Sequence, residues 1–221
     1  MIDTSTILST MLSTIIDMIK PIWFLLPILA VLLFLKTSKG KGKFGEFIVN
    51  SKVKSSLDED YYLLKDVTLP SRDGTTQIDH IIVSKFGIFV IETKNMSGWI
   101  FGDAKQRYWT QVIFKEKNRF QNPLHQNYKH IKTLQEILGV DEDKIHSVIV
   151  FIGDCEFKTP MPPNVLKGGY IDYIKSFKKV VFSKTYMQKL IEKIEKSRLT
   201  KGIKTYIKHI KNVKRVIANK A

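Results

Sequence analysis

The amino-acid sequence predicts an α/β protein whose core runs in the order short helix, three-stranded meander, second helix and buried strand. Residues 61–94 contain three strand-like apolar stretches separated by turn residues. Residues 122–139 begin with Asn-Pro, continue with apolar residues at helical spacing and end at a glycine. Residues 145–152 form a nearly continuous apolar run, which is typical of a buried strand. We expect an N-terminal transmembrane helix before this core and a basic helical C-terminal extension after it.

Residues 1–36 are expected to form the membrane anchor. The stretch from Pro21 to Leu35 contains no charged residue, and extension back to Ile15 brings its length close to a hydrocarbon core of roughly 30 Å. Lysines crowd residues 36–43, so the positive-inside rule places the rest of the chain in the cytoplasm, as in a single-pass protein of the plasma membrane. A cleaved signal peptide and a buried core helix are the alternatives.

The elements of the core follow from turn and cap residues. Residues 37–43, rich in glycine and lysine, are expected to be a flexible linker to a domain at residues 44–155. Within this domain we expect a helix at 44–57, strands at 61–69, 77–84 and 88–94, a small hairpin at 98–102 and 107–114, a second helix after Asn122 and a strand at 145–152. Asn122-Pro123 suits the start of a helix, and Gly139 suits its end.

The positive charge of the chain is concentrated near its C-terminal end. The formal net charge is +15, and residues 167–221 contain 16 Lys and Arg against 3 Asp and Glu. We therefore expect residues 156–221 to be a basic extension, with a strand at 178–183 and helices at 185–197 and 203–217. Such charge attracts polyanions, either nucleic acid or an anionic membrane surface. A surface that serves only solubility is the alternative.

The sequence contains a single cysteine, Cys155. One cysteine excludes an internal disulfide and any zinc site built from several cysteines. It fits a reducing compartment, and we expect an ordinary packed thiol at this position.

Asp79, Glu92 and Lys94 are expected to meet on one β-hairpin. A two-residue turn at Phe86-Gly87 places Asp79 opposite Lys94, with Glu92 two residues along on the same face. Two neighbouring carboxylates repel each other and attract a hard cation such as Mg²⁺ or Mn²⁺. Such an ion can activate a water at a phosphodiester, and a nearby lysine can stabilise the charge that develops. A salt-bridge cluster on an exposed sheet face is the alternative, although apolar residues occupy both faces of these strands.

Residues 77–102, QIDHIIVSKFGIFVIETKNMSGWIFG, resemble the nuclease-related domain (NERD), a branch of the PD-(D/E)XK restriction-endonuclease-like superfamily. The resemblance extends over residues 42–151, about half of the chain. It implies a restriction-endonuclease-like core and hydrolysis of phosphodiester bonds with a divalent metal. Asp79 matches the metal-binding aspartate of the superfamily, and Glu92-Thr93-Lys94 matches its E-x-K motif.

Two further motifs agree with the resemblance. Phe44-Gly45-Glu46 matches the first helix of the family, which makes Glu46 a candidate third carboxylate. Gln126 matches the glutamine of nucleases that carry Q-x-x-x-Y, whereas His130 stands in place of the tyrosine and its role stays open. The resemblance therefore implies a catalytic set that contains Lys94, Glu92, Asp79, Glu46 and Gln126, with Mg²⁺ or Mn²⁺ held by Asp79, Glu92 and Glu46.

Two functions from different classes follow. The first is a membrane-anchored cytoplasmic nuclease that depends on a divalent metal, with DNA as the expected substrate and the basic extension in contact with its phosphates. The second is a catalytically silent nucleic-acid-binding or membrane scaffold protein that keeps the nuclease fold. In either case the last helix is also a candidate for contact with anionic lipid beside the anchor.

Overall fold

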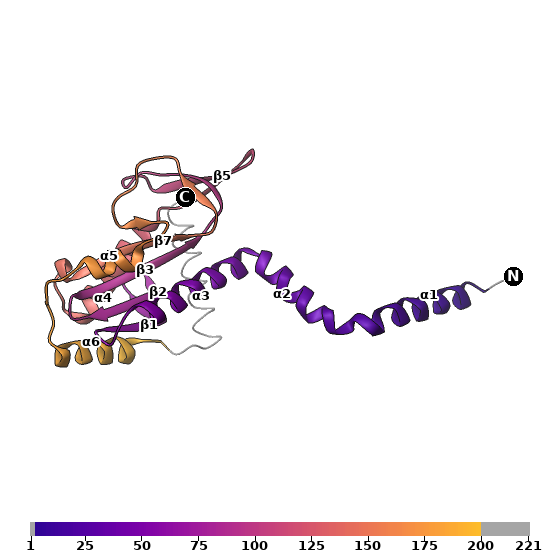
Figure 1. Ribbon diagram of the computed structural model, residues 1–221, viewed down its shortest axis with the longest axis horizontal. Helices are drawn as coiled ribbons and strands as arrows, with labels where there is room; N and C mark the ends of the chain where they lie inside the picture. The colour runs from indigo at the N-terminus through magenta and orange to yellow at the C-terminus, as the bar shows by residue number, and fades with distance from the viewer. Residues whose placement is uncertain (1–2, 200–221) are drawn as a thin grey trace. The chain divides into compact units, whose positions relative to one another are not determined.

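The computed structural model describes residues 3–199 and divides the chain into two compact units, residues 1–44 and 45–221 (Figure 1). The second unit contains the mixed α/β core that the sequence predicts. The last basic helix of the prediction, at residues 203–217, lies outside the described residues.

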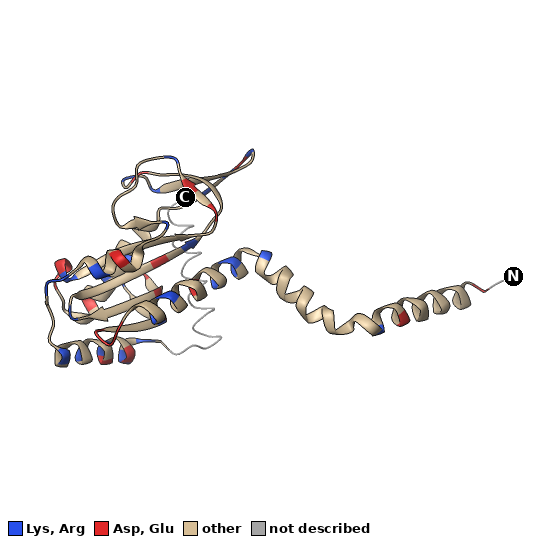
Figure 2. Ribbon diagram, viewed as in Figure 1, with Lys and Arg blue, Asp and Glu red and all other residues tan. Residues whose placement is uncertain are grey.

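The N-terminal unit begins with a helical, apolar segment. Its elements are α1 (Thr4–Ile19), the 3₁₀ segment η1 (Lys20–Leu25) and α2 (Leu26–Lys36). Pro21 and Pro27 stand at the starts of η1 and α2, where the missing N–H of proline interrupts regular helical hydrogen bonding. Thr4–Lys36 is long and apolar enough to cross a membrane, and α2 carries no charge before Lys36 (Figure 2). A signal sequence or a buried core helix has similar length and composition.

The next helix, α3 (Ser38–Ser56), begins earlier than the sequence predicts. The prediction of a flexible linker at residues 37–43 is therefore wrong from Ser38 onward. The hydroxyl of Thr37 accepts a hydrogen bond from the backbone N–H of Gly40 at 3.0 Å, as an N-cap side chain does. This cap allows a helix to start in a glycine-containing stretch that disfavours helix by composition alone.

The core of the second unit is a five-stranded sheet with the order β1-β2-β3-β7-β9. Its strands are β1 (Tyr61–Ser71), β2 (Gly74–Ser84), β3 (Gly87–Asn95), β7 (Ile145–Ile152) and β9 (Val165–Leu166). The first three form the antiparallel meander that the sequence predicts. After α4 (Pro123–Leu138) and the short η2 (Glu142–Lys144), β7 joins β3 in parallel. The predicted order of helix, meander, helix and strand is confirmed.

Helices cover both faces of this sheet (Figure 1). On one face, α4 and α6 (Lys184–Ser197) bury Leu134 and Leu190 against the sheet. On the other face, α3 and α5 (Tyr170–Ser176) bury Val49 and Ile174. The main sheet is therefore the middle layer of three.

The segment after β7 differs in part from the prediction. The helix expected at 185–197 is present as α6, whereas α5 has no counterpart in the prediction. The strand expected at 178–183 is wrong, because the backbone N–H groups of Val181 and Phe182 both donate to the carbonyl of Lys85. This segment therefore contacts the turn between β2 and β3 instead of joining a sheet.

A second, smaller sheet has the order β6-β5-β4-β8. Its strands are β4 (Gly98–Phe101), β5 (Tyr108–Ile113), β6 (Glu116–Gln121) and β8 (Cys155–Phe157). The predicted pairing of β4 with β5 is confirmed, but β6 and β8 are too polar or too short to be recognised in the sequence. The inner face buries Ile100 and Trp109 against Phe151 of β7, and the thiol of Cys155 is packed there as expected.

Candidate active site

The turn between β2 and β3 lies one residue earlier than the sequence predicts. Ser84 pairs with Gly87, so the two turn residues are Lys85 and Phe86. The Ser84 hydroxyl accepts a hydrogen bond from the Phe86 N–H at 3.1 Å and donates one to the Gly87 carbonyl at 3.0 Å. Glycine is needed at position 87 because its φ is +139° and a Cβ there would lie 2.7 Å from His146 Nε2.

This turn shifts the register of the hairpin by two residues. The β2–β3 ladder ends at the pair His80 and Ile91, so the next step brings Asp79 level with Glu92. The prediction that Asp79 faces Lys94 is therefore wrong. A shift of two residues, unlike a shift of one, leaves each side chain of β3 on the face where it was expected. The shift thus brings the two carboxylates closer together rather than separating them.

The regular alternation of β1 and β2 breaks at the level of Asp79. Two pairs of residues three apart join the same core cluster, Leu64 with Val67 and Ile78 with Ile81. In a regular strand, residues three apart point to opposite faces. The ladder registers on either side place Asp66 level with Asp79, and Asp66 has a φ of +50°. Both strands therefore change alternation at one level, and Asp79 occupies that level.

The carboxylate of Asp79 reaches across to the end of β3. Its Oδ2 accepts a hydrogen bond from the backbone N–H of Thr93 at 3.0 Å. Burial and the negative charge of Glu92 raise the pKa of Asp79 well above its usual value, and the Thr93 N–H opposes this only in part. Asp79 and Glu92 therefore form a carboxylate pair in which the negative charge of Glu92 disfavours ionisation of Asp79.

Glu92 and Lys94 lie on the face of β3 that α4 covers. The ammonium of Lys94 donates hydrogen bonds to Glu92 Oε1 at 2.7 Å and to Gln126 Oε1 at 2.9 Å. Gln126 belongs to the first turns of α4, so the helix holds the lysine in position. Glu92 is only 2% exposed, and a carboxylate this deeply buried requires a paired cation.

His130 lies one helical turn after Gln126 and approaches the other oxygen of Glu92. His130 Nε2 is 3.3 Å from Glu92 Oε2, an ion-pair distance without hydrogen-bond alignment, and the Thr76 hydroxyl is 2.8 Å from Nδ1. Burial works to raise the pKa of Glu92, but Lys94 and His130 outweigh it and hold this pKa below its usual value. Glu92 is therefore the more easily ionised member of the carboxylate pair.

Glu46, the expected third carboxylate, lies on α3 beside the same end of β3. Gly45 permits the close packing of this helix, because a Cβ there would lie 3.0 Å from Asn95 Cβ. The charge of Glu46 contributes to the raised pKa of Asp79. Within residues 3–199, however, no three His, Cys, Asp or Glu side chains are close enough together to hold one metal ion. The structure thus gathers Asp79, Glu92, Lys94 and Gln126 and does not bring Glu46 into a metal-binding group with them.

The carboxylate pair nevertheless fits Mg²⁺ or Mn²⁺. Mg²⁺ is commonly held by one or two carboxylates and keeps several water ligands, so a third protein ligand is not required. Asp79 and Glu92 supply this pair, and Glu92 Oε2 has no hydrogen-bond partner among the described residues. A divalent cation held by these two carboxylates would also offset the repulsion by Glu92, which adds to the effect of burial on the pKa of Asp79.

The model of the nuclease-related domain family matches residues 41–152, about half of the chain. The chain belongs to this family. The matched NERD segment contains Asp79, Glu92, Lys94 and Gln126, all of which lie in or beside the network just described. Membership of the family that the sequence resembles is therefore confirmed.

Two known proteins show similarity to this NERD chain. An uncharacterized protein of Bacillus anthracis is 46% identical over 121 residues. The match covers 54% of this chain and 57% of that protein, so the chain spans little more than half the length of this relative. The second is SfsA from Pyrococcus furiosus, whose structure was solved in complex with Ca²⁺ and whose sequence is 19% identical. The match covers 73% of this chain and 54% of the SfsA chain. Its TM-score is 0.25, so this likeness adds nothing to the assignment.

The NERD site also depends on residues that sequence reasoning missed. The side chain of Asn127 donates hydrogen bonds to the Val90 carbonyl and to the Ser147 hydroxyl, both at 2.8 Å. These bonds tie α4 to β3 and β7 just behind the carboxylates. The signal in the sequence is an asparagine in the apolar stripe that continues through Ile131 and Leu134. Thr76, by contrast, occupies an ordinary strand position, and nothing in the local pattern marks its contact with His130.

Proposed function

We propose that this NERD protein is a membrane-anchored nuclease that hydrolyses phosphodiester bonds of DNA with Mg²⁺ or Mn²⁺. The supporting observation is the 2.7 Å contact between Lys94 Nζ and Glu92 Oε1 beside a second carboxylate, Asp79. Carboxylates that repel each other next to a positioned lysine suit metal-dependent hydrolysis of phosphodiesters.

Each side chain has a distinct part in the proposed reaction. Asp79 and Glu92 would hold the metal, which supplies charge neutralisation at the phosphodiester and an activated water. An ammonium has three N–H donors. Lys94 directs two of them to Glu92 and Gln126, and we assign the third to the reacting phosphate. His130 restricts the movement of the Glu92 carboxylate from the other side.

We further propose that the nuclease domain lies on the cytoplasmic side of the plasma membrane. Thr4–Lys36 is a single apolar segment near the N-terminus, and Lys36, Lys39, Lys41 and Lys43 follow at its end. Such clusters are retained in the cytoplasm. The two charges inside the segment, Asp17 and Lys20, form an ion pair at 2.8 Å, which reduces the cost of placing them near lipid.

The proposal is tested by a cleavage assay with the full chain in detergent micelles. Labelled single-stranded DNA, duplex DNA and RNA are incubated with the protein in Mg²⁺, in Mn²⁺ and in EDTA. We expect cleavage of DNA with either metal and none in EDTA. Glu92→Gln and Lys94→Ala should each reduce the rate by roughly 100-fold or more, because each removes a group that acts on the metal or the phosphate.

A matched control comes from a second lysine–glutamate pair. Lys132 Nζ and Glu142 Oε2 are 2.6 Å apart on the surface, outside the network of Asp79. Lys132→Ala and Glu142→Gln should leave the cleavage rate unchanged. Cleavage that survives both Glu92→Gln and Lys94→Ala would overturn the assignment of the active site.

The alternative function is that of a catalytically silent binding protein. Two observations support it: Glu92 is deeply buried, and it is already paired with a cation. Under this alternative the full chain binds nucleic acid with an affinity that falls with salt, and Glu92→Gln leaves that affinity unchanged. For the basic extension, residues 156–221, we propose sequence-independent contact with phosphates of nucleic acid. Anionic lipid is its alternative partner, and co-sedimentation of the protein with anionic and neutral vesicles distinguishes the two.

A further inference from the structure

The small sheet turns one face away from the hydrophobic core. Ile100 and Trp109 are buried on the inner face. Trp99 pairs with Val112, and the alternation of β5 puts Tyr108 on the same outer face as Val112. Trp99 is 49% exposed and Tyr108 is 37% exposed. The outer face therefore presents two large aromatic rings that the hydrophobic core does not use.

A cation lies over each of these two rings. Lys158 Nζ is 4.8 Å from the centre of the Trp99 ring. The guanidinium carbons of Arg107 and Arg119 are 5.2 Å and 5.1 Å from the centre of the Tyr108 ring. Alternating aromatic rings and cations offer stacking surfaces and phosphate contacts within one strip of the sheet.

Phe114 adds a third aromatic ring at the tip of the β5–β6 hairpin. Its side chain is 98% exposed, and its φ is +52°. A non-glycine residue in this region costs conformational energy, and glycine would occupy the position without strain. A fully exposed phenylalanine at a strained position contributes little to the fold, which indicates a role in binding.

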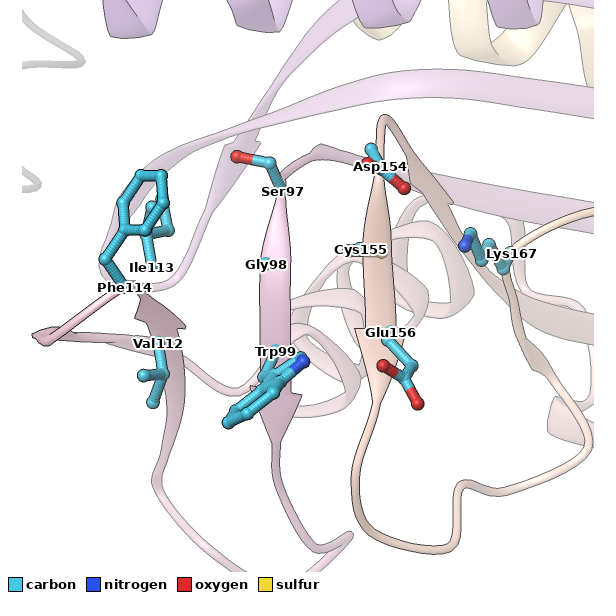
Figure 3. A pocket seen from close by; sticks show the side chains of 10 residues that line it. All are labelled: Ser97, Gly98, Trp99, Val112, Ile113, Phe114, Asp154, Cys155, Glu156 and Lys167. Carbon is cyan, nitrogen blue, oxygen red and sulfur yellow. The ribbon is translucent and has the colours of Figure 1, made fainter.

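Phe114 and Trp99 both line an open pocket on the small sheet. It has a volume of about 720 Å³ and lies between β4, β5 and β8 (Figure 3). Figure 3 shows the Phe114 ring on one side, Lys167 on the other side beyond β8, and the Trp99 ring between them. Volumes of this order are typical of sites for small organic groups.

The charge around the rings is positive. Residues 97–121 contain five Lys and Arg against two Asp and Glu. The acidic residue next to Trp99 on the outer face, Glu156, is paired with Lys158 at 2.6 Å. Asp154 and Glu156 line the pocket together with Lys167, so the excess of positive charge lies on the strands and hairpin that carry the rings, where it is complementary to a polyanion.

This surface is joined directly to the candidate active site. Lys94 lies near the end of β3, and β4 begins at Gly98, only four residues later. The two are also linked through Asn122, which caps α4 and donates hydrogen bonds to the carbonyls of the loop between β4 and β5. The small sheet is thus held next to the strand and helix that carry Lys94 and Gln126.

We propose that the outer face of the small sheet, with Trp99, Tyr108 and Phe114 as stacking residues, binds a single-stranded segment of the DNA substrate. Its bases stack on the aromatic rings, and its phosphates contact Arg107, Arg119 and Lys158. A single strand is required because bases in a duplex already stack on each other and do not expose their faces. The identity of the polymer rests on the proposed nuclease function, whereas the binding surface itself rests on the small sheet.

The test measures binding without turnover. The full chain in detergent micelles is titrated into labelled oligothymidylate in EDTA, and fluorescence anisotropy reports the Kd. Trp99→Ala should raise the Kd by roughly 5- to 100-fold, because a stacked base contributes on this scale. Tyr128→Ala is the matched control, because Tyr128 is also exposed and has Lys132 Nζ 5.2 Å from its ring centre, but lies on α4. It should leave the Kd unchanged.

Phe114→Gly provides a variant that does not threaten folding. It removes the ring and relieves the positive φ, so the melting temperature should stay the same or rise while the Kd rises severalfold. Direct stacking is reported by tryptophan fluorescence in a Trp23→Phe background, where exposed Trp99 should be quenched by the oligonucleotide and buried Trp109 should not.

The outcomes separate this proposal from the nuclease function. A Kd that is unchanged in both Trp99→Ala and Phe114→Gly, or equal affinity for a duplex, overturns the binding surface. It does so even if the wild-type protein cleaves DNA in Mg²⁺. Weaker binding in these two variants with no cleavage by the wild type supports the surface and overturns the nuclease function instead.

Discussion

The carboxylate of Asp79 accepts a hydrogen bond from the backbone N–H of Thr93 at 3.0 Å, where β2 and β3 stop pairing. The bond provides a partner for the Thr93 N–H, which lies beyond the last residue pair of the β2–β3 ladder. It also commits an acidic side chain to a position beside Glu92, where its charge is disfavoured. The sheet therefore accepts an electrostatic cost at this position, where two carboxylates are held together.

Replacement of Asp79 by asparagine should stabilise the metal-free protein at neutral pH. The pKa of Asp79 is raised in the folded state, so the folded protein binds a proton that the unfolded chain releases once the pH rises above 3.8. The free energy of unfolding therefore decreases as the pH rises from 3.8 to the raised pKa of Asp79 in the folded protein. Asp79→Asn keeps an oxygen for Thr93 and removes the charge, so thermal unfolding should show a gain of about 1 kcal/mol, or roughly 2–4 °C.

The same variant reports on the metal. Mg²⁺ should raise the melting temperature of the wild type, because a ligand that binds only the folded state stabilises it. Mg²⁺ should raise the melting temperature of Asp79→Asn much less. A melting temperature that falls in the variant without metal would contradict the electrostatic cost assigned to Asp79.

His80 should make the protein less stable at mildly acidic pH. It is completely buried, neither ring nitrogen has a hydrogen-bond partner among the described residues, and burial lowers its pKa from 6.5 to about 4. The unfolded chain therefore takes up a proton first, and stability falls as the pH drops from about 6.5 to about 4, by up to roughly 3 kcal/mol. Urea unfolding across this range should show a smaller loss for His80→Leu than for the wild type. An identical pH dependence in the two proteins would rule out His80 as the cause.

Removal of the Gln126 side-chain amide should slow catalysis without weakening binding. Gln126 Oε1 accepts a hydrogen bond from Lys94 Nζ at 2.9 Å and so sets the position of the ammonium. Gln126→Ala should lower kcat by roughly 10- to 100-fold, as is typical when the partner of a catalytic group is lost. Single-turnover cleavage measures the rate, and binding in EDTA measures the affinity. Gln135→Ala, on the same helix, is the control; a rise in Kd that explains the whole effect would argue against a positioning role.

Asn122 should be among the most sensitive positions for stability. Its side chain is completely buried, accepts a hydrogen bond from the Leu124 N–H at 2.9 Å and donates one to the Gln106 carbonyl at 2.7 Å. Asn122→Ala should cost about 2–4 kcal/mol, since it removes a helix cap and leaves buried carbonyls unpaired. Asn122→Asp keeps the cap but loses the donor, so its melting temperature should fall between the other two. Equal stability of wild type and Asn122→Asp would show that only the cap matters.

The N-terminal segment should hold the protein in the membrane. Thr4–Lys36 offers more apolar length than the roughly 20 residues that a span requires. The full chain should therefore stay in the membrane fraction after an alkaline wash, and a variant without residues 1–36 should be released. Recovery of a protein shortened at its N-terminus would indicate a cleaved signal sequence instead.

Local patterns in the sequence predicted much of the scaffold. The apolar stretches between turn residues identified β1, β2 and β3, and the Asn-Pro start and glycine end identified α4. They succeeded because caps, turns and hydrophobic period are properties of neighbouring residues. The linker prediction failed because Thr37 acts as a cap in a segment whose glycines suggest coil. The strand expected at 178–183 failed because its N–H groups bond the Lys85 carbonyl far away in the sequence.

In the β2–β3 hairpin, some features follow from the sequence alone and others depend on the tertiary structure. The sequence by itself determined that Glu92 and Lys94 share one face of a strand beside Asp79, because a spacing of two residues on a strand is independent of its partner. Only the tertiary structure decided the register of the hairpin, the break in alternation at Asp79, and the contacts of Gln126 and His130 with the pair. These depend on how Gly87 meets His146 and how α4 lies across β3, which are long-range packing relationships that no local pattern encodes.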